Sequence, residues 1–188
     1  MKKVIVVPGF LEPKKDKGLI KPLFKEFDII FFNYDNKLNE PLEESSKKLK
    51  KFVDSLKLKK NEKVSIVGLS AGGVITDYYL KHFSHKKVDK FISIFSPFKG
   101  SFWANIFSRK RKGLNQLKPN SEFLEKLSRK KAKHVKRMSV WCFFDPVVSG
   151  FSAKGQNPNH SLFFLHNFRF MQNKFPIVSK VKKFLNQK

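Results

Sequence analysis

The sequence contains almost no cysteine and no long apolar stretch. Cys142 is the single cysteine among 188 residues, which excludes an intramolecular disulfide and a zinc site built from several thiolates. No apolar run approaches the roughly 18 residues of a membrane-spanning helix. The first run, residues 4–7, ends at Pro8-Gly9, before the roughly 7–15 residues of a signal-peptide core. We therefore expect a protein of the cytoplasm.

Acidic residues are also scarce. Asp and Glu number 15 against 40 Lys and Arg, which gives a formal net charge of +25. Such a chain attracts polyanions, for example nucleic acid or an anionic membrane surface. Only five of the basic residues are arginine, the side chain that binds phosphates and guanines in a bidentate manner. The composition favours a solvated lysine surface and predicts no specific nucleic-acid recognition, while a weak association with anionic membranes or other polyanions stays open.

Apolar and aromatic residues, by contrast, are plentiful, at 40% and 14% of the chain. Short apolar runs typical of parallel strands buried on both faces occupy residues 3–7, 28–32, 63–68, 90–96, 138–144 and 161–165. Apolar residues at helical spacing occupy residues 19–27, 42–56 and 177–185, and a further helix is expected at about 121–128. This alternation predicts an α/β fold, a doubly wound, mostly parallel six-stranded sheet with helices on both faces.

We expect residues 1–188 to form a single domain, because the chain is long enough for one full core and hardly for two. Residues 97–136 interrupt the strand–helix alternation with a long, strongly basic connection. This segment is interpreted either as a cap- or lid-like insertion or as a solvated crossover with an apolar underside.

A candidate nucleophile follows the third predicted strand, in the pentapeptide Gly68-Leu69-Ser70-Ala71-Gly72. This is a G-x-S-x-G pattern between a strand and a helix, the context of a nucleophile elbow. The small residues around Ser70 permit a strained turn, and the start of the helix favours a developing negative charge. An ordinary turn with an N-capping serine is the alternative interpretation.

A serine hydroxyl needs a base, and the base needs a carboxylate that orients it. Asp145 comes directly after the fifth strand, and Asp35, after the second, is its nearest competitor. His166 follows the last strand, whereas His160 precedes it. Because parallel strands end at one edge of a sheet, we favour Ser70, Asp145 and His166 as the catalytic residues over a set containing His160.

Two backbone N–H groups are expected to form an oxyanion hole. One belongs to Ala71, directly after the serine, and the other to Phe10, in the turn after the first strand. Phe98, Trp103 and Phe107 are candidates for an apolar acyl pocket, with ordinary core positions as the alternative.

At these residues the chain resembles the α/β-hydrolase superfamily, in particular small bacterial lipases and esterases of the triacylglycerol-lipase type. The turn at residues 6–10, the pentapeptide at 68–72, and the segments 96–101, 116–124 and 145–148 are similar to motifs of that family. Leu69 and Pro8 stand where the family often has histidine.

The resemblance implies a serine hydrolase that cleaves carboxylic esters of small molecules or lipids through an acyl-enzyme, with no metal and no organic cofactor. Acyltransferases and thioesterases share this framework, so these activities stay open. The rival from another class is a catalytically inert hydrolase-fold module that binds polyanions through its basic surface.

Overall fold

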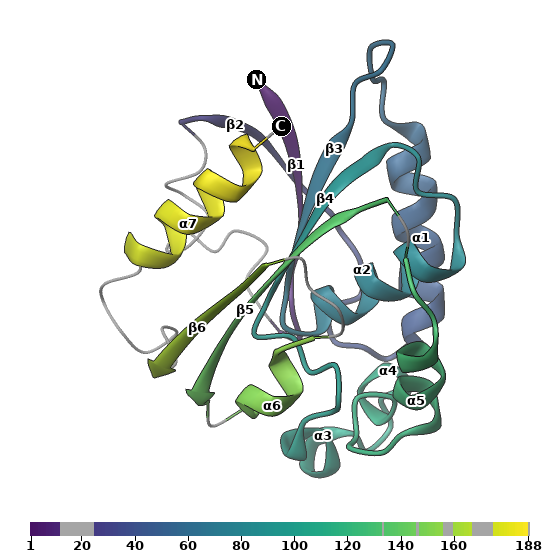
Figure 1. The fold of residues 1–188 in the computed structure, drawn as a ribbon. Helices are drawn as coiled ribbons and strands as arrows, with labels where there is room; N and C mark the ends of the chain where they lie inside the picture. The colour runs from purple at the N-terminus through teal and green to yellow at the C-terminus, as the bar shows by residue number, and fades with distance from the viewer. Residues whose placement is uncertain (12–24, 133, 146, 156–159, 167–174, 188) are drawn as a thin grey trace.

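The computed structural model describes residues 1–11, 25–132, 134–145, 147–155, 160–166 and 175–187. Of residues 143–144, 160–166 and 175–177 it describes the backbone alone. Six strands form one sheet in the order β2-β1-β3-β4-β5-β6, and every neighbouring pair is parallel (Figure 1). The strands are β1 (Lys2–Val7), β2 (Phe27–Phe31), β3 (Val64–Leu69), β4 (Val88–Ile94), β5 (Lys136–Phe144) and β6 (His160–His166).

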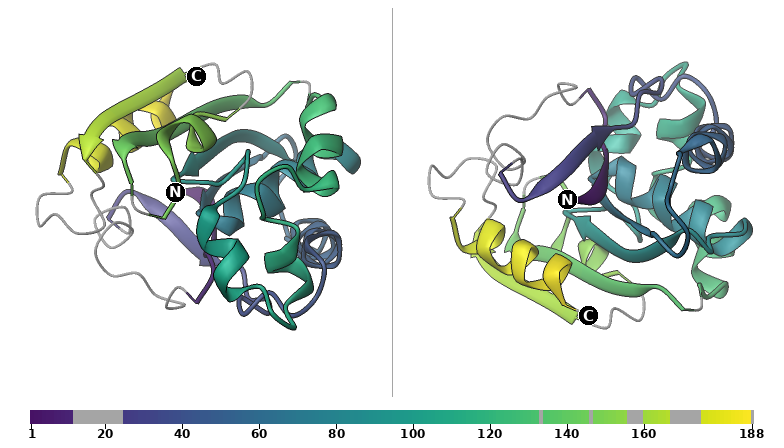
Figure 2. Two further views of the ribbon diagram at one scale, coloured as in Figure 1. Left: turned by 90° about the horizontal axis from the view of Figure 1, so that it is seen from below. Right: turned by 90° about the horizontal axis from the view of Figure 1, so that it is seen from above.

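Helices cover both faces of the sheet, which confirms the predicted doubly wound α/β architecture. Helices α1 (Leu42–Ser55) and α2 (Ala71–His82) pack on one face, and α7 (Phe175–Asn186) lies on the other (Figure 2). Alternate strand residues serve the two faces: Ile5 packs in the core with α1 and α2, whereas Val4 and Val6 pack with α7. This alternation is the period of two of a β-strand.

The helix predicted at residues 19–27 is wrong at its last residue. Phe27, assigned to a helix by its spacing from Leu19, Ile20, Leu23 and Phe24, is the first residue of β2 and pairs with Lys2 of β1. Leu19 to Phe24 lie outside the described residues. Phe27 is buried on the α7 face of the sheet, so an apolar residue at helical spacing from its neighbours in the sequence belongs to a strand.

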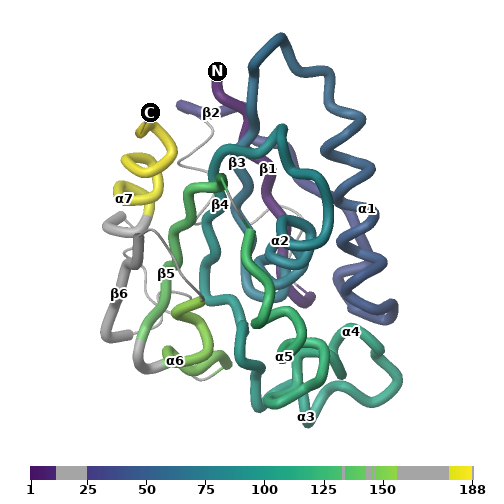
Figure 3. The backbone as a smooth tube through the Cα atoms, turned by 45° about the vertical axis from the view of Figure 1, so that its right-hand side comes forward, coloured from purple at the N-terminus to yellow at the C-terminus, as the bar shows by residue number. Residues whose placement is uncertain are grey.

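The long connection between β4 and β5 contains three short helices: α3 (Phe102–Phe107), α4 (Lys112–Asn115) and α5 (Glu122–Arg129). Helix α5 confirms the helix expected at 121–128, and Ser121 caps it by accepting the N–H of Leu124. Together with α6 (Gly150–Ala153), α3 lies beyond the carboxyl ends of the strands (Figure 3). None of the described helices is long and apolar enough to cross a bilayer.

Two buried basic side chains hold distant segments together. The ammonium of Lys90, in β4, donates to the carbonyl of Leu185 at 2.9 Å and to that of Gln187, and so caps the end of α7. Arg137, in β5, pairs with the buried carboxylate of Asp77 in α2, which also binds Lys81 at 2.8 Å. A positive charge at a helix C-terminus is favourable, and a buried charge is tolerated when it is paired.

Candidate active site

The candidate site lies where the strand order reverses. The chain leaves β1 toward β2 on one side and leaves β3 toward β4 on the other, while β1 and β3 are neighbours, with Val7 opposite Gly68. Crevices at the carboxyl ends of strands at such a switch point are the usual ligand sites of open α/β sheets. The turn with Phe10 follows β1 and the turn with Ser70 follows β3, so the fold brings these two segments together.

Ser70 has the backbone geometry of a nucleophile elbow. Its φ of 50° and ψ of −121° are strained for a residue with a side chain, and its hydroxyl makes no capping hydrogen bond to α2. Ser70 occupies the N-cap position of α2, but its side chain does not cap the helix, unlike that of an ordinary N-capping serine. Its N–H donates to the carbonyl of Ile94 at 2.8 Å, and its carbonyl accepts the N–H of Gly73 at 3.0 Å, so the turn is fixed on both sides.

The last glycine of the pentapeptide allows the two turns to touch. A Cβ at Gly72 would lie 2.2 Å from the carbonyl oxygen of Val7 and 2.5 Å from that of Pro8. The same carbonyl of Pro8 accepts the hydroxyl of Tyr34 at 2.7 Å, and Leu11, at a φ of 52°, donates its N–H to Asn36 at 3.1 Å. The turn with Phe10 is thus held against the first turn of α2 from one side and against the loop after β2 from the other.

Ser70, Ala71 and Phe10 line one cavity of about 60 Å³ with mostly apolar walls. In the described part of the chain, neither the N–H of Phe10 nor that of Ala71 donates a hydrogen bond within the protein. Two N–H groups without a hydrogen-bond partner, in one cavity with a serine, are what an oxyanion site requires. Trp103 and Phe107, two of the three predicted pocket residues, line the same cavity and stack at 5.6 Å between ring centroids.

Phe98, the third predicted pocket residue, is not among the residues that line this cavity. It is buried in the core of the α1–α2 face and borders a different hollow, beside Lys99 and Leu124. Phe98 follows Ser96 and Pro97, where the chain turns inward after β4, so its alternative assignment to the core is the one that the structure supports.

Asp145 follows β5 at the same edge of the sheet. One oxygen of its carboxylate, Oδ1, accepts the N–H groups of Val147 at 2.7 Å and Val148 at 2.9 Å. These two bonds fix the orientation of the carboxylate. The competitor Asp35 uses both of its oxygens within its own loop, on the N–H groups of Lys37 and Asn39 and on the amide of Asn39.

The backbone of His166 ends β6 beside Asp145, since Phe144 and His166 are partners in the β5–β6 register. The imidazole of His166 lies outside the described side chains. His160 begins the same strand, opposite Met138, and is about 20 Å away along a strand that rises about 3.3 Å per residue. The topology therefore places His166, and not His160, at the edge that carries Ser70 and Asp145.

The other three histidines lie toward the amino edge of the sheet. His82 ends α2, His85 precedes β4 and His134 precedes β5. His82 stacks on Tyr78 at 3.8 Å between centroids, and burial lowers its pKa. Among the five histidines, only His166 has its backbone at the carboxyl edge.

The sequence analysis assigned no individual role to several residues of the site. Val147 and Val148 donate to Asp145 and also line the cavity, where they face Leu114 and Leu117 of the long connection. Ser101 links the two walls through a hydrogen bond from Oγ to the carbonyl of Val147 at 2.5 Å. The sequence signal for these residues was an acidic residue at the end of a strand followed closely by two valines. The same pattern also occurs where the chain simply reverses direction, so it did not identify a site.

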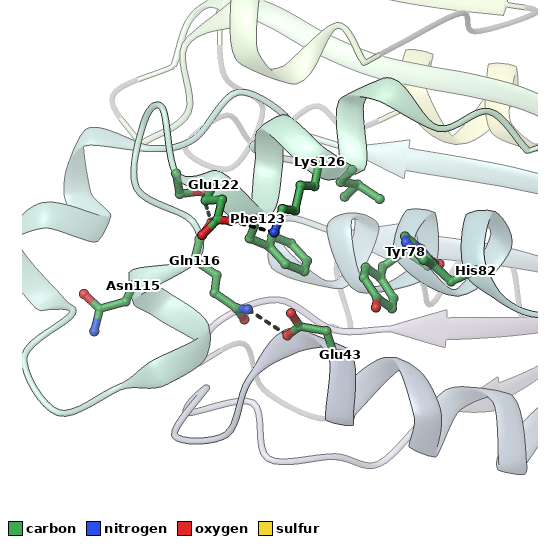
Figure 4. A pocket seen from close by; sticks show the side chains of 10 residues that line it. Glu43, Tyr78, His82, Asn115, Gln116, Glu122, Phe123 and Lys126 are labelled. Atoms are coloured by element: carbon green, nitrogen blue, oxygen red, sulfur yellow. Dashed lines mark hydrogen bonds and ion pairs between the residues drawn. The ribbon is translucent and has the colours of Figure 1, made fainter.

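A larger cavity, of about 390 Å³, lies between α1, α2 and the start of α5 (Figure 4). Three of its polar side chains are engaged within the protein: Glu43 accepts the amide of Gln116, Ser121 caps α5, and Nδ1 of His82 contacts the carbonyl of Tyr78. Size alone would favour this cavity, but none of these pairs provides a free nucleophile with a base.

A family model for lecithin:cholesterol acyltransferase matches residues 25–156. The chain belongs to this family. The matched range contains Ser70 and Asp145, whereas Phe10 and His166 lie on either side of it. No curated protein matches the chain by sequence.

Solved structures show that this member of the lecithin:cholesterol acyltransferase family has the α/β-hydrolase fold of lipases and esterases. The mature lipase BlEst2 of Bacillus licheniformis is 14% identical and superposes with a TM-score of 0.77 over 96% of this chain and 91% of that chain. Lipase B of Aspergillus fumigatus is 19% identical, with a TM-score of 0.71 over 92% of this chain but 46% of that chain. The ydeN gene product of Bacillus subtilis is 14% identical, with a TM-score of 0.67 over 100% of both chains.

Proposed function

We propose that this protein is a serine hydrolase that cleaves carboxylic esters through an acyl-enzyme, with Ser70, His166 and Asp145 as its catalytic residues. The observation that carries the proposal is the arrangement at Ser70: a strained turn whose hydroxyl caps no helix, in a cavity shared with the unused N–H groups of Phe10 and Ala71. Membership of a family named for acyl transfer, and the fold shared with lipases, support the same chemistry.

In the first half-reaction Ser70 Oγ attacks the ester carbonyl carbon while His166 takes the hydroxyl proton. The carbonyl oxygen becomes an oxyanion, which accepts hydrogen bonds from the N–H groups of Phe10 and Ala71. When the tetrahedral intermediate collapses, the carbon–oxygen bond to the alcohol breaks, and His166 returns the proton to the departing alkoxide. The acyl group is then esterified to Ser70.

In the second half-reaction a water replaces the alcohol. His166 removes a proton from the water as its oxygen attacks the acyl-enzyme, and the proton returns to Ser70 Oγ when the acid departs. Asp145 fixes the tautomer of His166 and stabilises the imidazolium that forms in each half. The two N–H bonds from Val147 and Val148 hold the carboxylate of Asp145 in place throughout.

A fluorophosphonate probe and a p-nitrophenyl acetate assay test the proposal. We choose a short acyl ester because the cavity at Ser70 is small. We expect the native protein to be labelled and to turn over the ester, and Ser70→Ala to lose both while remaining folded. Ser55→Ala, on the exposed side of α1, is the matched control and should retain both activities. A folded native protein that neither reacts with the probe nor cleaves the ester would contradict the proposal and favour an inert module.

The choice of base is tested by the two histidines of β6. His166→Ala should lower kcat by at least about 10³-fold, since removing one member of a triad leaves only the residual catalysis of binding and the oxyanion hole. His160→Ala, at the other end of the strand, should leave kcat near that of the native protein. The opposite result would move the base to His160 and would require a different path for the chain beside Asp145.

Acyl transfer to an alcohol is a second candidate, favoured by the name of the matching family. The two reactions share the acyl-enzyme and differ in whether water or an alcohol attacks it. Adding a primary alcohol to the p-nitrophenyl ester assay separates them, because a transferase forms the new ester in preference to the free acid, whereas a hydrolase forms mainly the acid.

A further inference from the structure

The cavity of about 390 Å³ between α1, α2 and the start of α5 is separate from the cavity that contains Ser70. Among the described residues, none lines both cavities. The segment of α4 forms the partition: Leu114 and Leu117 line the Ser70 cavity, whereas Asn115 and Gln116 line the larger one. Volumes of roughly 300–1,000 Å³ are usual for small-molecule sites, so the larger cavity has room for a ligand of its own.

Three stacked rings form an apolar wall of the larger cavity. In Figure 4 Tyr78 lies between Phe123 and His82. The ring centroid of Tyr78 is 5.5 Å from that of Phe123 and 3.8 Å from that of His82, and the interplanar angles are 14° and 12°. Leu127, which is buried, also lines the cavity. These side chains of α2 and α5 offer an apolar surface to the body of a ligand.

Glu43, in the first turn of α1, gives the larger cavity a negative charge that no cation balances. Its Oε2 accepts the amide of Gln116 at 2.7 Å, and this donor is neutral. Within the described part of the chain, the carboxylate of Glu43 makes no ion pair. Lys47, one turn further along α1, binds Glu44 instead, at 2.7 Å. The lysine closest along the helix is therefore committed to another carboxylate.

The second acidic residue of the lining is neutralised within the protein. Glu122 binds the ammonium of Lys126 at 2.5 Å, so this pair adds no net charge. With His82 neutral, the lining carries one negative charge, at Glu43, although the whole chain has a formal net charge of +25. A half-buried carboxylate beside apolar rings is costly unless a cation or several donors meet it. The charge and surroundings of Glu43 therefore favour a cationic ligand.

The hydroxyl of Tyr78 lies on the same side of the cavity as Glu43. In Figure 4 its oxygen is on the edge of the ring that faces this carboxylate. Burial raises the pKa of Tyr78, and the charge of Glu43 raises it further, so the hydroxyl stays protonated within electrostatic reach of the carboxylate. No hydrogen bond engages this hydroxyl within the described residues. The oxygen of Tyr78 and Oε1 of Glu43 can therefore both accept hydrogen bonds from one ligand.

We propose that the larger cavity binds a primary organic ammonium ion with an apolar body. The ammonium donates hydrogen bonds to Oε1 of Glu43 and to the oxygen of Tyr78, while the apolar body packs against Phe123. The uncompensated carboxylate, the second acceptor and the apolar wall match the parts of such a ligand. A quaternary ammonium has no N–H group, so it could use the charge but neither acceptor. The site contains no residue of the Ser70 cavity and does not depend on the function proposed above.

Calorimetric titration with three ligands of similar shape tests the proposal. 2-Phenylethylammonium carries the expected positive charge, 2-phenylethanol is neutral and phenylacetate is negative. The overall charge of +25 attracts phenylacetate, whereas the cavity favours the ammonium, so the sign of the preference separates the cavity from general electrostatics. We expect the native protein to bind the ammonium at least about tenfold more tightly than the alcohol, because a charge-assisted hydrogen bond is the stronger one, and to bind phenylacetate most weakly.

Two substitutions of glutamate supply the matched comparison. Glu43→Gln removes the charge and keeps an oxygen for the amide of Gln116. It should weaken binding of the ammonium at least about tenfold and leave binding of the alcohol unchanged. Glu125→Gln makes the same change at an exposed carboxylate of α5 outside this cavity, so it should bind all three ligands as the native protein does.

Two substitutions of aromatic residues separate the apolar wall from the polar end. Phe123→Ala should weaken binding of the ammonium and of the alcohol alike, because both lose the same apolar contact. Tyr78→Phe keeps the stacked ring and removes one acceptor, so it should weaken binding of the ammonium about tenfold and spare the alcohol. Circular dichroism verifies that each variant is folded, and Tyr78→Phe supplies the test if Glu43→Gln is not.

Several outcomes would overturn the ammonium site. They are binding of phenylacetate as tightly as of the ammonium, native affinity for the ammonium in a folded Glu43→Gln protein, and no binding of the ammonium at about 10 mM. Ser70→Ala should bind the ammonium as the native protein does, and a loss of binding in that variant would move the ligand to the Ser70 cavity and overturn the separate site. If the protein cleaves no ester but binds the ammonium as expected, only the function proposed above falls.

Discussion

Replacing Gly72 by alanine should move Ser70 away from the proposed oxyanion hole. The added Cβ would lie 2.2 Å from the carbonyl oxygen of Val7, and ordinary contact begins at 3.4 Å, so the two segments must separate by 3.4 − 2.2 = 1.2 Å. Because the obstructing atoms belong to the backbone of Val7 and Pro8, no side-chain rotation relieves the clash. The separation moves the N–H of Phe10 away from the carbonyl oxygen of the substrate.

A misplacement of about 1 Å at a reacting centre costs about 10²-fold, and loss of an oxyanion donor costs about 10²–10³-fold in kcat. We therefore expect Gly72→Ala to lower kcat on p-nitrophenyl acetate about 100-fold with little change in KM, because the negative charge on the oxygen develops only as the ester is attacked and is absent from the bound substrate. Overpacking should also lower the free energy of unfolding by about 1–3 kcal/mol.

Thr76→Ala separates the two effects. Thr76 is buried one turn further along α2 and donates its hydroxyl to the carbonyl of Gly72 at 2.8 Å. Its loss should destabilise the protein by about 0.5–1.5 kcal/mol and leave kcat nearly native, since the turn with Phe10 does not move. Urea unfolding and steady-state kinetics are measured on both variants. A Gly72→Ala protein with native kcat would refute the contact between the two turns as the support of the oxyanion site.

Three further predictions concern buried charges and histidine. Asp77→Asn should lower the free energy of unfolding, measured by urea titration, by about 3–5 kcal/mol, because Lys81 and Arg137 would both remain buried without their carboxylate. Arg137→Met should lower the free energy of unfolding less, since Asp77 still pairs with Lys81. Burial and the nearby ammonium of Lys2 lower the pKa of Lys90 from 10.5 to about 8, so between these pH values the unfolded chain binds more protons than the native protein. The free energy of unfolding of the native protein, relative to that of Lys90→Met, should therefore rise with pH over this range. A difference that stays constant with pH would contradict the lowered pKa. Burial likewise lowers the pKa of His82 from 6.5, so the native protein should lose stability as the pH falls below that value. His82→Phe keeps a ring that can stack on Tyr78 but cannot be protonated, so its thermal unfolding temperature should fall less over the same pH range.

The six strands and the candidate residues of the site could be predicted from local patterns, whereas the sheet order β2-β1-β3-β4-β5-β6 was not predicted. Residues 64–69 are apolar except for Ser65, and all six are buried, as expected of a strand covered on both faces. The pentapeptide at 68–72 predicted the turn at Ser70 because few residue types tolerate its geometry, and Asp145 and His166 followed from the rule that parallel strands end at one edge.

The sequence could not predict which residues of the long β4–β5 connection are buried in the core and which are exposed. Phe98 and Phe102 lie four positions apart and are equally apolar, yet one is buried and the other is 70% exposed. A solvated lysine surface was expected, yet Lys90 is buried against the carbonyl of Leu185, and Arg137 is likewise buried against Asp77. Likewise, position 72 in α2 requires glycine because a Cβ there would collide with the carbonyl oxygen of Val7, which lies in β1.

The sequence by itself therefore determined what depends on neighbours along the chain: the period of two in the strands, the tight turn at Ser70, and the chain order of serine, aspartate and histidine. Tertiary structure decided which side chains meet water and which meet each other. The physical reason is that burial and pairing energies depend on distances between residues remote in sequence, and those distances exist only once the sheet has formed.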